Sequence, residues 1–173
     1  VFQSEIRQVL ERMSPVRFFL GQPETLEQMA LEEVVGTCFD LARNRTGALL
    51  VFQRRDLLED HLKGGIPLDG RISSEVISSI FLPNSPAHDG AVILHGGRIV
   101  SVGCYLPLSD NPVLPRHYGS RHRAGIGITE KSDAISLIVS EERGEVSLAV
   151  KGGITRMDNP GDLQGHLGSM LFQ

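Results

Sequence analysis

The strongest constraint on the fold comes from four short apolar runs, each bounded by turn-forming or charged residues. Runs of this length and composition are typical of buried strands. They are "ALLVF" at 48–52, "AVIL" at 91–94, "AISLIVS" at 134–140 and "EVSLAVK" at 145–151. Gly96-Gly97 predicts a tight hairpin turn into a further strand, "RIVSVGCYL" at 98–106, and Glu142-Arg143-Gly144 predicts a turn between the last two runs.

Helical patterns separate these strands. The clearest runs from Thr25 to about Asn44, where Thr25 and Gln28 have the form of a capping box. Shorter helices are expected in "RDLLEDHLK" at 55–63, closed by Gly64-Gly65, in "SEVISSIF" at 74–81 and within "GSRHRAGIGITEKSD" at 119–133. Because hairpins alternate with helical crossovers, the sequence predicts an α/β domain with one mixed sheet flanked by helices.

Composition narrows the function classes. The 173 residues, 40% of them hydrophobic, suit one domain with a substantial core. The formal net charge of −4 argues against a nucleic-acid-binding surface built on bulk positive charge. Cys38 and Cys104 lie in apolar contexts and are interpreted as reduced core residues of a cytosolic protein. No apolar run is long enough to span a bilayer, so this chain is expected to be soluble, and its start at Val1 without Met suggests a fragment of a longer protein.

Two ionisable residues, His88 and Asp89, stand directly before a strand and are followed by Gly90 and Ala91. A carboxylate at a strand mouth can hold a divalent cation or accept a proton from a hydroxyl. A following glycine lets a ligand approach the backbone closely. The alternative is that Asp89 caps a turn and His88 is a surface residue.

A basic cluster, Arg121-His122-Arg123, follows Gly119-Ser120 and precedes an expected helix. Guanidinium groups bind phosphate oxygens in pairs, and a helix N-terminus adds free N–H donors. These features predict a polyphosphate site, and the alternative is a solvated cluster paired with nearby acids.

Two further stretches complete a nucleotide site. Ser140, Glu141 and Glu142 follow an apolar strand, where the acids could join Asp89 around a metal or could belong to an ordinary hairpin turn. The segment Leu106-Pro107-Leu108 can present an apolar wall to a flat ring, or can be a simple turn. Together the four stretches predict phosphoryl or nucleotidyl transfer. The sequence contains neither a P-loop nor a dinucleotide-binding fingerprint.

These motifs resemble those of the bacterial diadenylate cyclase domain, in which "DGA" (here 89–91) and "RHR" (here 121–123) are the signatures, in this order. The segments "LPLSDNP" and "SEERGEVSLA" resemble the membrane-anchored class most. The resemblance covers roughly residues 25–153 and implies that family's fold. Residues 1–24 are then interpreted as a linker helix after a missing membrane anchor, and 154–173 as a C-terminal tail.

The resemblance implies an activity, the condensation of two ATP into cyclic di-AMP and two pyrophosphates by two domains facing each other in a homodimer. It implies a catalytic group made of Asp89, Arg121, His122 and Arg123. A metal (Mg²⁺, Mn²⁺ or Co²⁺) would be held by Asp89, His88 and Glu142. The implied ATP-binding residues are Gly90, Ala91, Leu106, Gly119, Ser120, Arg121, His122, Arg123 and Ser140.

The resemblance further implies a cytoplasmic domain of a bacterial cell-membrane protein, with a membrane-bound regulator and a sugar-phosphate mutase as partners. A nucleotide sensor without catalytic activity is the alternative. A metal-dependent phosphohydrolase of the "HD" type is disfavoured, because the other histidines lack metal-ligand spacing. A nucleic-acid partner is not expected, given the acidic balance and the few aromatic residues.

Overall fold

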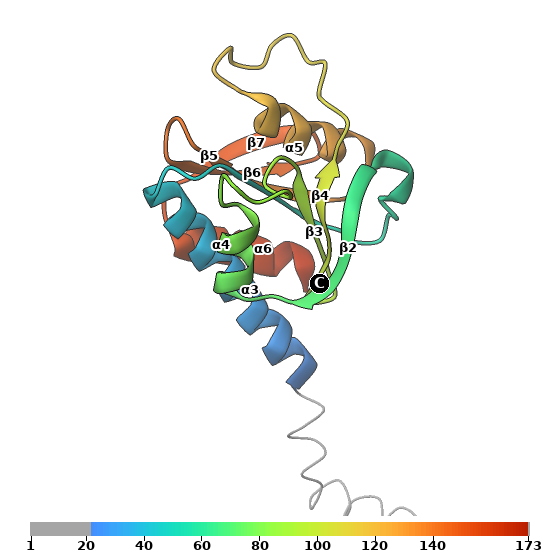
Figure 1. Ribbon diagram of the computed structural model, residues 1–173, viewed down its shortest axis with the longest axis vertical. Helices are drawn as coiled ribbons and strands as arrows, with labels where there is room; N and C mark the ends of the chain where they lie inside the picture. The colour runs from blue at the N-terminus through green and yellow to red at the C-terminus, as the bar shows by residue number, and fades with distance from the viewer. Residues whose placement is uncertain (1–21, 173) are drawn as a thin grey trace, which may run out of the picture.

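The computed structural model describes residues 22–172, with side chains from residue 27 onward. Within these residues, seven strands form one sheet in the order β2-β4-β3-β1-β5-β6-β7 (Figure 1). β1 and β3 run parallel, and the other neighbouring pairs are antiparallel, so the sheet is mixed as predicted. The strands are β1 (Ala48–Phe52), β2 (Lys63–Arg71), β3 (Ala91–His95), β4 (Arg98–Tyr105), β5 (Ile135–Ser140), β6 (Glu145–Val150) and β7 (Gly153–Met157).

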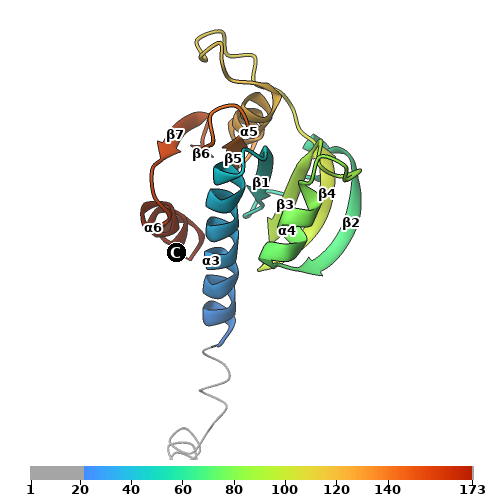
Figure 2. The ribbon, with the colours of Figure 1, turned by 60° about the vertical axis from the view of Figure 1, so that its left-hand side comes forward.

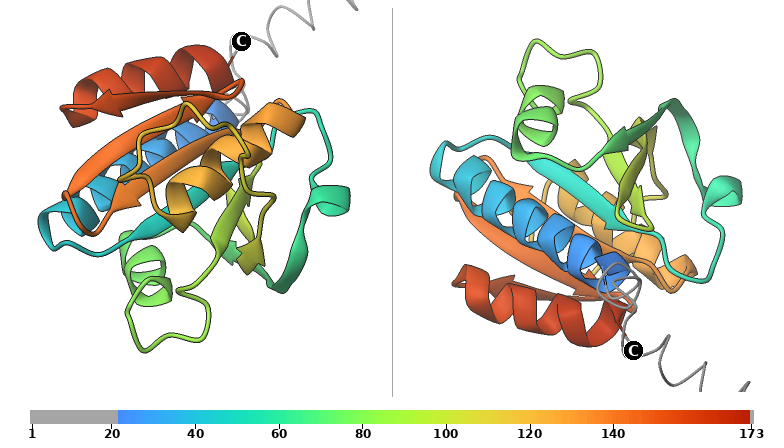
Figure 3. Two further views of the ribbon diagram at one scale, coloured as in Figure 1. Left: turned by 90° about the horizontal axis from the view of Figure 1, so that it is seen from above. Right: turned by 90° about the horizontal axis from the view of Figure 1, so that it is seen from below.

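Helices cover both faces of this sheet (Figures 2 and 3). On one face lie α3 (Gln22–Arg43), α4 (Ser74–Ile80) and α6 (Pro160–Leu171), with α3 packed between the other two. On the opposite face, α5 (Ser120–Lys131) packs over β5, β6 and β1. Within the described residues, no helix combines the length and apolarity needed to cross a membrane.

The central strand β1 shows why the apolar runs are continuous. Its five residues are all buried. Ala48, Leu50 and Phe52 join the core beneath α3, whereas Leu49 and Val51 join the core beneath α5. Successive strand residues point to opposite faces, so a strand covered on both sides needs apolar residues at every position.

Several sequence predictions are confirmed. The predicted strands at 48–52, 91–94, 98–106, 134–140 and 145–151 are present, with ends that move by at most one residue. The hairpin turn at Gly96-Gly97 has the positive φ angles of a tight turn, 57° and 73°. Cys38 and Cys104 are free and buried, as expected of reduced core residues.

The predicted helix at 55–63 is wrong. Only a single 3-10 turn forms there (η1, Glu59–His61), and the edge strand β2 begins at Lys63. Gly64 and Gly65, interpreted as a helix stop, lie inside β2 with positive φ angles of 65° and 97°. A Cβ on Gly65 would lie 2.5 Å from Cys104 Sγ, so the glycine lets this edge strand approach β4 closely. Because β2 is exposed along almost its whole length, it carries no apolar pattern.

The predicted start of the first helix at Thr25 is also wrong. α3 begins at Gln22, so Thr25 lies inside the helix and not at its N-cap. Pro23 falls in the first turn, where its missing N–H costs no helical hydrogen bond. The helix predicted from the opening residues, 1–13, lies outside the described residues.

The segment interpreted as a C-terminal tail forms two ordered elements. β7 adds an edge strand beside β6, and α6 packs against α3. Asn159 caps α6 by accepting a hydrogen bond from the Asp162 N–H at 2.8 Å. Leu163 and Leu167 are completely buried, at helical spacing, so the segment contributes to the main core.

This packing makes the last helix a test of the fold. We predict that Leu163→Ala lowers the free energy of unfolding by about 2–5 kcal/mol, because it removes buried methyl groups and leaves a cavity between α6 and α3. His166→Ala, on the exposed face of the same helix, is the matched control and should change stability little. Urea unfolding followed by circular dichroism measures both. Equal stability of the two variants would mean that α6 does not pack as described.

Candidate nucleotide site

The strand directions gather four chain segments at one edge of the sheet. β1 is parallel to β3 and antiparallel to β5, with Leu50 beside both Val92 and Leu137. The starts of β1 and β3 therefore lie beside the end of β5. The end of β4 joins them, because Cys104 pairs with Ala91 at the start of β3. This edge lies at the upper end of the sheet in Figure 1, below the projecting loop that leads into α5.

α5 brings the basic cluster to the same edge. Gly119 is its N-cap residue and supplies no capping side chain. The loop after β4 is held along the helix, since the Ser109 N–H donates to the Arg123 carbonyl at 2.9 Å. A Cβ on Gly127 would lie 1.9 Å from the Pro107 carbonyl oxygen, so only glycine permits this backbone contact. The segment predicted as an apolar wall is therefore attached to the helix that carries the arginines.

The loop before β3 presents an exposed carboxylate on a fixed backbone. Asp89 is exposed and His88 half-buried. His88 Nδ1 lies 2.6 Å from the Ser85 carbonyl oxygen, which can only accept, so Nδ1 carries the proton and Nε2 remains free as an acceptor or ligand. A Cβ on Gly90 would lie 2.5 Å from the Gly103 carbonyl carbon, so this glycine lets the loop rest directly on β4.

Arg121 connects three of the four predicted stretches. Its guanidinium donates to the His88 carbonyl oxygen at 3.4 Å and forms an ion pair with Glu141 at 3.4 Å. The side chain of Arg121 is 22% exposed and that of Glu141 is 59% exposed. The structure thus brings the loop of Asp89, the helix of Arg121 and the end of β5 together around one cation, although they are far apart in sequence.

Arg123 and His122 have different surroundings from Arg121. Arg123 is half-buried and reaches the Ser109 carbonyl oxygen at 3.5 Å, beside the loop after β4. The His122 ring is buried and stacks on Tyr118 with ring centroids 4.4 Å apart and planes 3° apart. Burial lowers the pKa of His122, with a smaller contribution from His117. The lowered pKa favours the neutral imidazole, which packs against Tyr118 from the first turn of α5.

The end of β5 places the remaining predicted residues. Ser140 is buried, and its Oγ accepts a hydrogen bond from the Arg143 N–H at 3.2 Å within the turn. The Glu142 side chain is exposed, while its carbonyl oxygen accepts from Arg45. Of the other predicted binding residues, Ala91 and Leu106 are buried and Gly119 and Ser120 are exposed.

Sequence reasoning missed two contributors to this edge, because it gave no role to Gly47 or to Tyr118. It considered pairing of the basic cluster with nearby acids as the alternative, but it did not name Glu141 as the partner of Arg121. A glycine before a strand and a tyrosine in a loop carry no pattern of their own, and only the structure shows what they touch. The ion pair joins residues on different elements, so no spacing along the chain reveals it.

The side chains at this edge can bind a metal ion only together with a bound nucleotide, whose phosphate oxygens supply further ligands. Within residues 27–172, no group of three or more His, Cys, Asp or Glu side chains lies close enough to hold a metal ion. Mg²⁺ in nucleotide sites needs no such group, since one or two carboxylates and phosphate oxygens suffice, with water filling the remaining positions. The exposed Asp89 carboxylate, the free His88 Nε2 and the exposed Glu142 carboxylate are oxygen and nitrogen donors of that kind.

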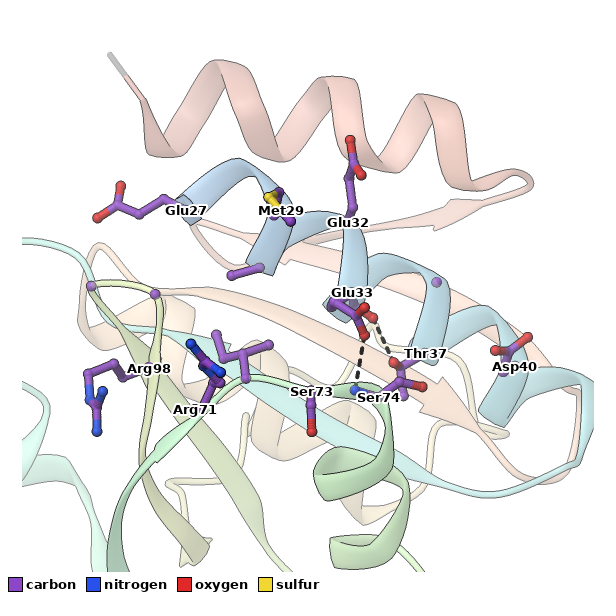
Figure 4. A pocket seen from close by; sticks show the side chains of 15 residues that line it. Glu27, Met29, Glu32, Glu33, Thr37, Asp40, Arg71, Ser73, Ser74 and Arg98 are labelled. Atoms are coloured by element: carbon purple, nitrogen blue, oxygen red, sulfur yellow. Dashed lines mark hydrogen bonds between the residues drawn. The ribbon is translucent and has the colours of Figure 1, made fainter. Parts of the chain in front are cut away.

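A wide groove of about 970 Å³ lies along α3 (Figure 4). It runs between α3, the β2–α4 junction and the Gly96-Gly97 turn, and contains none of the predicted site residues. The side chain of Glu33 on α3 accepts a hydrogen bond from the Ser74 N–H at the start of α4, at 3.0 Å. Figure 4 shows this bond joining the two sides of the groove. The groove is therefore separate from the edge that gathers the ionisable motifs.

Comparison with known proteins identifies the family. Residues 35–154 match the model of the DAC family, described as "DisA bacterial checkpoint controller nucleotide-binding". The chain belongs to the DAC family. The matched range contains all the residues discussed at the candidate site, and the predicted α/β fold is that of a DAC domain.

Relatives of this DAC domain carry related names. It is 43% identical over 159 residues to "Cyclic di-AMP synthase CdaA" from Bacillus subtilis, covering 90% of this chain and 58% of that protein. It is 42% identical over 156 residues to a "Diadenylate cyclase" from Listeria monocytogenes, covering 88% of this chain and 57% of that protein. The chain thus spans a little over half the length of these relatives.

Solved structures agree with this assignment. A crystal structure of DacA from Staphylococcus aureus, a double cysteine variant, has a TM-score of 0.81 and 39% identity, covering 85% of this chain and 98% of that chain. A "hypothetical membrane spanning protein from Bacillus cereus" has a TM-score of 0.71 and 37% identity, covering 73% of this chain and 62% of that chain. Sequence identity and structural similarity therefore both support the DAC domain fold.

The buried His122 gives a pH prediction. The pKa of His122 is lower in the folded protein than in the unfolded chain. The unfolded chain therefore binds more protons than the folded protein once the pH falls below about 6.5, the ordinary histidine pKa. Stability from this residue is complete above that pH and is lost as the pH decreases. We predict that between pH 7.5 and 5.5 the wild type loses more unfolding free energy than His122→Gln. The control is the exposed His166→Gln, which should follow the wild type. Identical pH profiles for all three would contradict a buried neutral ring.

Proposed function

We propose that this DAC domain is a diadenylate cyclase, which condenses two ATP into cyclic di-AMP and two pyrophosphates. The observation that carries the proposal is the convergence on Arg121, where the Asp89 loop, the first turn of α5 and the end of β5 meet. The names of the relatives support the same chemistry. A nucleotide sensor without catalytic activity needs the cations but not the exposed carboxylate beside them.

The first turn of α5 supplies the phosphate-binding groups in this proposal. Arg121 and Arg123, separated by His122 in the first turn, reach different neighbours, the His88 carbonyl and the Ser109 carbonyl. No side chain caps this terminus, which leaves backbone N–H groups for phosphate oxygens. As pyrophosphate leaves, charge builds on these oxygens, and fixed cations stabilise it without reorganising.

Asp89 is the proposed acid–base group. Its exposed carboxylate can accept the proton of the attacking 3′-hydroxyl. The adjacent backbone is fixed against β4 through Gly90, which holds the carboxylate in place. Asp89 would also hold the divalent cation, with His88 or Glu142 as a second protein ligand and with phosphate oxygens and water as the remaining ligands. When bound, the cation would neutralise phosphate charge and polarise the α-phosphate. Carboxylate oxygens suit Mg²⁺ and Mn²⁺, whereas an imidazole nitrogen suits a later transition metal such as Co²⁺ better.

The base would lie against the end of β4. Leu106 is buried there, while Tyr105 and Leu108 remain 56% and 54% exposed. Large exposed apolar side chains beside a phosphate site offer a stacking surface for a flat ring. Because this loop is attached to α5 through Ser109 and Arg123, base and phosphates would be held by one rigid unit.

Cyclisation requires two copies of this site. In each half-reaction a 3′-oxygen bonds to the α-phosphorus of the other ATP, the bond to pyrophosphate breaks, and the hydroxyl proton passes to a carboxylate. One chain presents one such edge, so two domains must face each other. We therefore propose a homodimer as the active species, formed through the exposed edge around Asp89.

The longer protein is proposed to be anchored in a bacterial cell membrane, with this domain in the cytoplasm. The similar structure from Bacillus cereus, a hypothetical membrane-spanning protein, supports this placement. A membrane-bound regulator and a sugar-phosphate mutase are proposed as partners on the family resemblance alone.

Removing the proposed acid–base group tests the reaction. We predict that Asp89→Asn lowers cyclic di-AMP formation by at least about 100-fold, because a general base contributes 10²–10⁴-fold. ATP binding should change much less, since the cations remain. Glu75→Gln, an exposed acid on α4, is the matched control. Mass spectrometry of reactions with ATP and Mn²⁺ measures product.

Two outcomes would contradict the proposal. Substantial turnover by Asp89→Asn would remove Asp89 from this role. No product from folded wild type at any metal concentration would refute the proposed enzyme activity.

The face-to-face requirement gives a second prediction. At concentrations below the dimer dissociation constant, the rate per domain should rise in proportion to total protein, because only dimers react. A monomer that cyclised alone would show a constant rate per domain. Initial rates measured over a hundredfold dilution series distinguish the two, with sedimentation measurements at the same concentrations as the reference.

A further inference from the structure

We infer that Gly47, immediately before β1, is a positioning residue for Arg121: the absence of a side chain there forms the space in which the guanidinium lies. This inference rests on the proposed function, which makes Arg121 a phosphate-binding group. Nothing in the sequence motifs points to Gly47.

The space beside Gly47 is already filled by Arg121. A Cβ built on Gly47 would lie 2.4 Å from Arg121 Nη1 and 2.8 Å from Cζ, and 3.1 Å from Glu141 Oε2. Ordinary contact begins at 3.4 Å, so an alanine methyl group would force the guanidinium to withdraw by about 1 Å. The carboxylate that pairs with it would also have to shift.

Backbone conformation does not explain the glycine. Gly47 is absent from the residues with positive φ, so an alanine can adopt its backbone angles. The residue is buried at the start of a strand, where Ala48 already continues the same run. What an alanine would disturb is therefore the neighbouring side chains, not the path of the chain.

The other close glycines at this edge behave differently. A Cβ on Gly90 would meet the backbone of Gly103, and one on Gly127 would meet the backbone of Pro107. Substitutions there must move one chain segment away from another. At Gly47 the three nearest atoms are the far ends of two side chains, Arg121 and Glu141, which can move without unfolding anything.

The position of Arg121 depends on this space because its other contacts are long. The hydrogen bond to the His88 carbonyl and the ion pair with Glu141 both measure 3.4 Å, near the limit for such interactions. A side chain at Gly47 would therefore displace the guanidinium, since a Cβ there would lie 2.4 Å from Arg121 Nη1. Displacement by about 1 Å can reduce catalysis on the order of 100-fold.

Gly47→Ala in the whole chain tests the inference. It should melt at or above the wild-type temperature and lose kcat/KM for cyclic di-AMP formation on the order of 100-fold. Gly36→Ala is the matched control, because a Cβ at that exposed position of α3 meets nothing within 4 Å. It should keep full activity. Full activity in Gly47→Ala would overturn the inference, and so would an unfolded Gly47→Ala, since the fold is argued to tolerate it.

A double-mutant cycle separates positioning from a structural role. Binding of α,β-methylene-ATP with Mn²⁺ is measured by calorimetry for wild type, Gly47→Ala, Arg121→Ala and the double variant. If Gly47 acts through Arg121, Gly47→Ala weakens binding in the wild-type background and adds no loss to Arg121→Ala. Equal losses in both backgrounds would overturn the inference. If folded wild type makes no cyclic di-AMP, the proposed function fails, while this binding cycle still decides the role of Gly47.

Discussion

The site depends on one topological constraint, the reversal of strand direction around β1. Because β1 runs parallel to β3 and antiparallel to β5, the residues before two strands and after a third meet at one edge. A wholly parallel sheet would have placed the end of β5 at the opposite edge from the start of β3. The mixed sheet instead brings the Asp89 loop and Glu141 to opposite sides of the β1 entrance. α5 then needs only to pack over β1 and β5 to deliver Arg121 between them.

Close backbone contacts, more than side-chain hydrogen bonds, hold this edge together. Gly90 rests on Gly103, and Gly127 admits the Pro107 carbonyl. Each contact joins segments whose side chains carry the proposed chemistry, the Asp89 loop to β4 and the β4 exit loop to α5. Fixing backbones in this way leaves the charged side chains exposed at their tips. That is the combination a nucleotide site needs, since catalytic groups must be both accessible and held in place.

The sequence predicted the interior of this fold better than its boundary. Buried strands such as β1 and β5 must be apolar at every position, so their runs were visible without a structure. The edge strand β2 is exposed and begins with two glycines of positive φ, so these glycines resembled the stop of a helix predicted in the preceding residues, 55–63. At the site, the sequence motifs pointed to Asp89 and Arg121, because a carboxylate and a guanidinium can be recognised as candidate functional groups from residue identity. Gly47 escaped notice because what matters there is the absence of a side chain. The effect of that absence appears only when Arg121 packs beside it in the folded chain.

The Arg121–Glu141 ion pair explains how an acidic protein can keep a cation available for the phosphate group that we propose it binds. The chain has a formal net charge of −4, so an uncompensated guanidinium at its surface would be expected to attract a local carboxylate. Glu141 does so, but its side chain is 59% exposed, and ion pairs of that kind are worth no more than about 1 kcal/mol. Exchanging the carboxylate for a phosphate oxygen therefore costs little. Because the His88 carbonyl also accepts a hydrogen bond from the guanidinium, Arg121 keeps a backbone partner when its anionic partner changes. A cation with such a partner is available to the phosphate ligand that we propose.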